Sequence, residues 1–261
     1  MSQIRPIFLI AGNTITGVLR GVVLNVLLVL AALMLMVIMV TSSLEPSEMR
    51  RMLVDSGLAI ITMLSAMIAI LTGFTMIPTE VENRTLYPVI SKPVRRWQFV
   101  LGKFMGAAGI NAITVALLSV LFFVMYLLKM NWEFDARLIM AVIMIYVMLL
   151  VLSALIIFFS TFMSWIGTII VSMVIWFIGS YSQILYDLAQ NHGSGKLSST
   201  LFIAVQKLLP NFQVMDLRYD IVQLEVVRFE TMRILGPMGN AGLFVVVALA
   251  LAILIFNYRE L

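Results

Sequence analysis

Long stretches without a single charged residue dominate this sequence. They cover residues 21–44, 56–79, 104–128, 138–186 and 234–258. A helix needs about 20 apolar residues to cross about 30 Å of hydrocarbon. Four of these runs have the length of one span, and the fourth in order is about twice as long. The pattern predicts an all-α integral membrane protein.

Composition supports this prediction. The chain is 62% hydrophobic and 11% charged, whereas soluble domains are about 45–50% apolar and about 25% charged. Cysteine is absent, which excludes disulfides, thiolate metal sites and cysteine nucleophiles. The only histidine is His192, so a dedicated metal site is not expected, and flexible apolar packing is the better interpretation of the twenty methionines.

The double-length run is expected to form two helices joined by a turn at 160–164. Ser160, Thr161 and Ser164 interrupt the apolar sequence there, and Ser164 is suited to cap the following helix. The six predicted transmembrane helices cover about 21–43, 56–78, 98–128, 138–160, 164–186 and 238–258. A five-span arrangement with one long, tilted helix is the alternative.

The distribution of basic residues predicts the orientation. The loop between the second and third spans carries the densest basic cluster, which consists of Arg84, Lys92, Arg95, Arg96 and Lys103. The positive-inside bias places this loop and both termini in the cytoplasm. We therefore expect a multi-pass protein of the bacterial cell (inner) membrane with an extracytoplasmic segment at about 187–233. Residues 221–230 fit either a strand or an interfacial helix.

The middle of each predicted span lacks Asp, Glu, Lys and Arg. Ion-coupled transporters usually carry such a residue, because a proton or cation needs a binding group. The strongest polar residues within the spans are Asn25, Asn111 and Gln183, for which interhelical hydrogen bonding is the favoured interpretation over substrate binding. The charge-free spans suit lipidic or amphipathic cargo somewhat better than ions.

The pair Gly102-Lys103 does not form a phosphate-binding loop. Such a loop has a glycine five positions earlier and Ser or Thr after the lysine, but this chain has Trp97 and Phe104 there. Lys103 is expected to extend its ammonium group toward water from the cytoplasmic end of a span. The spacings Gly17-x-x-x-Gly21 and Gly102-x-x-x-Gly106 permit close helix approach at two cytoplasmic ends.

The loop between the second and third spans is expected to contain a short cytoplasmic helix at about 79–91. Thr79 and Glu82 form a capping box, and acidic residues near a helix N-terminus stabilise its dipole. Pro88 and Pro93 limit the helix to two or three turns. The pattern alone fits equally a connector lying on the lipid surface and a peg inserted into a soluble partner.

The same loop resembles the signature of ABC-2-type ABC transporter permeases, the membrane subunits of type V-like ABC exporters. The matching order is Glu-x-Glu-x-Arg-Thr-Leu, then Ser-Lys-Pro-Val-x-Arg-Trp, then Leu-Gly-Lys, at residues 80–86, 91–97 and 101–103. Weaker similarities lie at 209–212, 216–218 and 258–260. The family often has a small residue where this chain has Arg95 and a glycine near Arg84.

The resemblance implies a specific assembly. It implies six spans per subunit, a second permease subunit that is identical or related, and a separate cytoplasmic ABC ATPase pair that binds ATP and Mg. The short helix would be the coupling helix, docking on the ATPase through Glu80, Glu82, Arg84, Thr85, Leu86, Ser91, Pro93 and Arg96. Catalytic residues, metal ligands and cofactors are not expected on this chain. Membrane lipid is an expected partner, and nucleic acid is not.

These observations favour the permease subunit of an ATP-driven transporter, with export as the family's usual direction. Two alternatives come from other functional classes. One is a non-transporting membrane assembly or sensor protein that recruits a cytoplasmic partner. The other is a channel or facilitator that works without ATP.

Overall fold

The computed structural model of this chain describes residues 5–21, 46–73, 96–130, 135–182, 210–218 and 231–258, and the single positions 25, 29, 32, 33, 36 and 221. Most of the expected first span, the expected coupling helix at 79–91 and most of the segment 187–233 lie outside these ranges, including nearly all of 221–230. Every regular element within the described ranges is a helix. Within these ranges the prediction of an all-α protein is confirmed.

Six α-helices and one short 3-10 helix make up the described structure. They are α1 (Arg5–Leu19), α3 (Pro46–Gly73), α6 (Arg96–Lys129), α7 (Arg137–Ser160), α8 (Trp165–Ser180), η1 (Gln213–Met215) and α12 (Thr231–Tyr258). Four segments of the described chain are long and apolar enough to cross a membrane: Met49–Gly73, Arg96–Lys129, Arg137–Ser160 and Leu235–Asn257. They correspond to the expected second, third, fourth and sixth spans.

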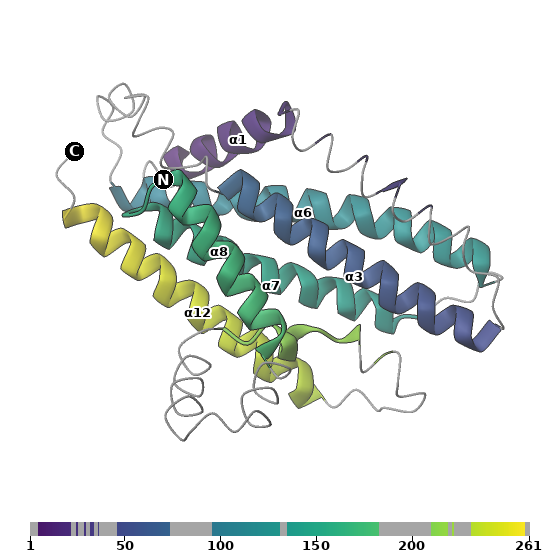
Figure 1. Cartoon of the computed structure of the whole chain (residues 1–261). Coiled ribbons are helices and arrows are strands. Elements are labelled where there is room, and N and C mark those ends of the chain that lie inside the picture. The colour runs from purple at the N-terminus through teal and green to yellow at the C-terminus, as the bar shows by residue number, and fades with distance from the viewer. Residues whose placement is uncertain are drawn as a thin grey trace, which may run out of the picture.

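The long helices α3, α6 and α7 lie side by side and form the centre of the bundle (Figure 1). Helix α12 packs on α7 and α6, and α8 packs on α7 and α3. Leu58, Leu118 and Leu149 are fully buried where the three central helices meet. Large apolar side chains such as Phe177 and Val246 are exposed on the outer helices, as expected where lipid replaces water as the solvent.

The predicted turn at 160–164 is confirmed. Helix α7 ends at Ser160, and Ser164 is the N-cap of α8, with an extended backbone and a side chain that accepts a hydrogen bond from the Gly167 amide at 3.4 Å. The double-length run therefore forms two helices. Helix α8 ends at Ser180, short of the expected boundary at 186, and residues 183–186 lie outside the described ranges.

Two helices begin earlier than the expected spans. Helix α3 begins at Pro46 instead of 56, and Arg50 on its second turn donates a hydrogen bond to Asp135 at 2.7 Å. The charged residues before position 56 belong to the same helix as the apolar residues that follow them. The change from charged to apolar residues therefore does not mark the beginning of the helix. Helix α12 begins at Thr231 instead of 238 and contains Pro237, which removes one backbone hydrogen bond without ending the helix.

Helix α1, which the apolar runs did not predict, packs against α6. An added Cβ would lie 2.9 Å from Ile10 Cβ at Gly102 and 2.8 Å from Thr14 Cβ at Gly106. These glycines let the two helices approach closely, as the Gly102-x-x-x-Gly106 spacing predicts. Gly17 has no heavy atom within 4 Å of its added Cβ, so it takes no part in this contact.

The segment 210–218 packs against the C-terminal end of α8 and against α7. Phe212 is only 1% exposed, and it lies against Gly179, where an added Cβ would be 2.5 Å from Phe212 Cδ2 and 2.8 Å from the Pro210 carbonyl oxygen. The Ser182 hydroxyl lies 3.1 Å from Asn211 Oδ1. This part of the expected extracytoplasmic segment is therefore packed among the helices.

Candidate functional site

Seven of the eight predicted docking residues lie outside the described ranges. They are Glu80, Glu82, Arg84, Thr85, Leu86, Ser91 and Pro93. The eighth, Arg96, is the first residue of α6. Contact between this loop and an ATPase therefore stays a prediction. The structure does show the contacts of Arg96, where the loop enters α6.

Arg96 caps the C-terminal end of α12. Its Nη1 donates hydrogen bonds to the carbonyl oxygens of Phe256, at 2.9 Å, and Asn257, at 3.0 Å. The last carbonyls of a helix lack intrahelical partners and carry partial negative charge, so a guanidinium group stabilises them. The residue that follows the loop is therefore bonded directly to the last described helix of the chain.

Aromatic packing reinforces this contact. The rings of Phe99 and Phe256 stack with centroids 5.8 Å apart and an interplanar angle of 13°. Both side chains are buried with Val100, Ala252 and others in a cluster contributed by α6, α7 and α12. Helix α1, the first turns of α6 and the last turns of α12 lie at the same end of the bundle (Figure 1). We call Arg96, Phe99, Phe256 and Asn257 the Arg96 cluster.

Lys103 lies one turn beyond Phe99 and is only 6% exposed. Its Nζ is 5.5 Å from the centroid of the Phe99 ring, within the range of a cation–π interaction. The expectation that this ammonium group extends into water is wrong. Helices α1, α7 and α12 all pack on α6, and this packing covers a side chain whose position near a helix end favours exposure.

Asn111 forms the interhelical contact that the sequence predicts. Its Nδ2 donates to Ser153 Oγ at 2.7 Å and approaches the Leu149 carbonyl oxygen at 3.4 Å, joining α6 to α7. Both side chains are buried. Asn25 is exposed, and Gln183 lies outside the described ranges.

We expect the Asn111→Ala and Ser153→Ala substitutions to be non-additive. Double-mutant cycles between polar side chains of membrane helices give coupling of about 0.6 kcal/mol on average and up to about 1.7, and this bond should fall in that range. The measurement is the free energy of unfolding of the four proteins in bicelles. Ser119→Ala is the matched control, because its buried hydroxyl on α6 has no partner within the described structure. Strictly additive effects would show that the Asn111–Ser153 bond contributes no stability.

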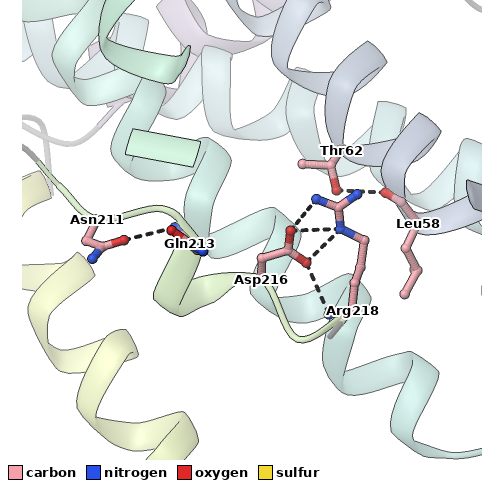
Figure 2. A network of polar contacts seen from close by, with 6 residues as sticks. All are labelled: Leu58, Thr62, Asn211, Gln213, Asp216 and Arg218. Atoms are coloured by element: carbon pink, nitrogen blue, oxygen red, sulfur yellow. Dashed lines mark hydrogen bonds and ion pairs between the residues drawn. The ribbon is translucent and has the colours of Figure 1, made fainter. Parts of the chain in front are cut away.

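A second polar cluster lies in the segment 210–218 and was not identified as a site from the sequence. The Arg218 Nε donates to Asp216 Oδ1 at 2.8 Å and to Oδ2 at 2.7 Å, and Nη2 also contacts Oδ2 (Figure 2). Burial by itself lowers the pKa of Arg218, but the hydrogen bond and charge of Asp216, with smaller contributions from Asp55 and Tyr181, raise the pKa overall. The signal available in the sequence was an opposite-charge pair two residues apart after Pro210.

This pair is not part of a metal centre within the described ranges, where no three His, Asp or Glu side chains gather closely enough to hold an ion. The Asp216 carboxylate instead accepts from Nε and Nη2 of Arg218 and from the Arg218 backbone amide, so the pair stabilises the turn within the segment. It also keeps one carboxylate and one cation in the lining of a pocket shared with α3 and α8.

The bundle and its four membrane-length helices define a multi-pass membrane protein. A family model described as ABC-2 family transporter protein matches residues 41–261. Because the match covers most of the chain, this protein belongs to the ABC-2 transporter family, and the resemblance seen in the sequence is confirmed. Comparison with curated proteins gives no match. The chain is a transport membrane subunit, not itself catalytic, of a family that normally pairs with an ABC ATPase.

Proposed function

We propose that this chain is the permease of an ATP-driven exporter and that the loop at 79–97 couples it to a separate cytoplasmic ATPase. The observation that carries this proposal is the family match over 41–261, which includes both the loop and all four membrane-length helices. ATP and Mg bind to the partner chains. Two permease subunits, identical or related, surround the path in the bacterial inner membrane, with both termini in the cytoplasm.

The Arg96 cluster supports a route for mechanical coupling. The loop connects α3 to α6, and Arg96 bonds the beginning of α6 to the end of α12. ATP binding closes the ATPases and displaces the short helix at 79–91. A displacement at Arg96 then acts on α6 and α12 together, because buried aromatic rings also join them. Tilting of these helices switches the cavity between the two sides of the membrane.

The two alternatives differ in what they require of a partner. A sensor or assembly protein recruits a partner without moving cargo, and a facilitator conducts without any ATPase. A neighbouring reading frame that encodes a P-loop ATPase without spans favours the exporter. Flux through liposomes that contain only this chain would favour the facilitator instead.

Co-purification tests the assembly. The tagged chain, expressed together with that neighbouring ATPase, is expected to retain it through purification. In nanodiscs, the complex should hydrolyse ATP several-fold faster than the ATPase alone, because the permease aligns the two nucleotide-binding subunits. Size-exclusion chromatography and phosphate release measure the two outcomes. A complex whose ATP turnover is unchanged by the permease would favour simple recruitment.

A further inference from the structure

A pocket of about 110 Å³ lies between α3, α7, α8 and the segment 210–218. Its polar and amphipathic lining comes from α3, from the C-terminal end of α8 and from the segment 210–218, and consists of Thr62, Trp176, Ser180, Tyr181, Gln213, Asp216 and Arg218. It lies away from the Arg96 cluster, which consists of residues from α6 and α12. Thr62 of α3 and Arg218, both drawn in Figure 2, line this same pocket.

The pocket is located well inside the bundle. Met148 also lines it and lies near the midpoint of α7, and Thr62 lies about 10 Å along α3 from Asp55, given a rise of about 1.5 Å per residue. Irregular backbone at such a depth occurs only where protein buries it or where it lines a polar cavity. Phe212, Met215 and Leu217 bury one side of the segment, and the pocket lies beside its polar residues.

Two donors around this pocket have no partner in the described structure. The indole Nε1 of Trp176 and the hydroxyl of Ser180 are buried without a hydrogen bond. An indole N–H can only donate, and a buried unsatisfied donor is destabilising. Both residues line the pocket, and an occupant whose acceptor oxygens reach these two buried atoms would satisfy them.

The charges around the pocket disfavour an anionic occupant. Asp216 and Arg218 already neutralise one another, and the only other charge known to act on Arg218 from the described residues is the carboxylate of Asp55, apart from the weaker influence of Tyr181. An anion therefore gains no net attraction. A hydroxyl, ester carbonyl or amide accepts the same hydrogen bonds without that penalty.

The rim of the pocket connects to an apolar surface. Met63 and Tyr181 line the pocket and are 53% and 42% exposed, so the opening lies between α3 and α8. Phe177 and Met173 continue along α8 for two further turns and are 54% and 52% exposed. An occupant with a polar head in the pocket can place an apolar tail along these side chains.

We propose that this pocket binds the head group of an uncharged amphiphile, with Trp176 and Ser180 donating hydrogen bonds to it. The volume corresponds to about three or four water molecules, which suits a glyceryl or small amide head. The site does not depend on the proposed export function, because binding here needs neither an ATPase nor a second subunit.

The test uses a monoacylglycerol with a diazirine beside its glyceryl head, photolabelling the full chain in phosphatidylcholine nanodiscs. Saturable labelling is expected at 59–63 and 176–181 and is located by mass spectrometry. Monooleoylglycerol should compete at least tenfold better than oleate, which has the same tail and an anionic head. Free glycerol should not compete. Comparable competition by glycerol would identify a soluble solute as the occupant, and comparable competition by oleate would contradict the charge argument, so either result overturns the proposal.

Two variants test the donors. Trp176→Phe keeps an aromatic ring but loses the N–H, and Ser180→Ala loses the hydroxyl. Each should weaken monooleoylglycerol competition about two- to tenfold, the range expected for one hydrogen bond. Ser172→Ala is the matched control, because Ser172 on the same helix is also buried without a partner in the described structure but does not line the pocket. It should bind like the unchanged protein.

Unfolding midpoints without amphiphile separate binding from folding. Removal of the unsatisfied Ser180 hydroxyl should leave the midpoint unchanged or slightly raised, whereas Trp176→Phe also loses packing against the core and should lower it. Competition that is unchanged in both Trp176→Phe and Ser180→Ala, or labelling spread evenly over all lipid-facing helices, would show that the pocket holds only water and would overturn the proposal.

Discussion

Replacing Glu80, Glu82 and Arg84 together by alanine is expected to abolish ATPase stimulation and transport while leaving membrane insertion intact. These three charged residues lie in the sequence before Arg96, the first residue of α6. They are proposed to contact the ATPase. Each hydrogen bond that involves a charged group contributes about 1.5–3 kcal/mol. Three such bonds at the lower limit amount to about 4.5 kcal/mol, and their loss would weaken the complex roughly two-thousandfold. Co-purification and phosphate release measure this loss.

A matched control is available on the expected opposite side of the membrane. Glu45, Glu48 and Arg51 also comprise two acids and one base, and their replacement by alanine should preserve ATPase stimulation. Because the chain has no cysteine, a single Ser91→Cys substitution reports the side of the loop through an impermeant thiol reagent. Normal stimulation in the first triple variant, or labelling of position 91 from outside intact cells, would exclude this loop from coupling.

Gly179→Ala is expected to lower the free energy of unfolding by about 1–3 kcal/mol, the usual cost of overpacking. Its Cβ would lie 2.5 Å from Phe212 Cδ2 and 2.8 Å from the Pro210 carbonyl oxygen. A ring can rotate, but the Pro210 backbone must move, and with it the segment that carries Asp216 and Arg218. Unfolding in bicelles measures the change, and monoacylglycerol labelling should fall because the pocket wall is displaced.

Gly167→Ala on the same helix is the control for this substitution. Its Cβ would lie 3.5 Å from Ser164 Oγ and 3.7 Å from Met163 Cβ, which are ordinary contacts. Alanine is favoured over glycine in a helix by up to about 1 kcal/mol, so this variant should be unchanged or slightly more stable. Equal stability of the two alanine variants would show that the segment 210–218 does not depend on its contact with Gly179.

Features that depend on nearby residues were predictable. The four membrane-length helices follow from apolar runs, because a helix satisfies its own backbone in lipid. The Ser164 cap is equally local, since the capped amide belongs to Gly167, three residues away. The glycine spacing in α6 predicted a close approach, although it did not identify α1 as the partner.

The family motif allowed the class of protein to be predicted, and the match over 41–261 confirms it. The docking role of residues 80–93 stays a prediction because those residues lie outside the described ranges. The pocket beside Asp216 and Arg218 was missed. Its lining joins positions from 59 to 218, and no local pattern shows which of these residues meet.

The sequence alone determined that this chain forms membrane-length helices with a break at 160–164. Apolar length and helix capping decide these features, and both depend only on neighbouring residues. Only the tertiary structure decided that Arg96 reaches Phe256 and Asn257, that Lys103 is buried, and that 210–218 packs beside α8. The physical reason is that burial and pairing depend on which helices pack together, and almost any apolar face can pack on another.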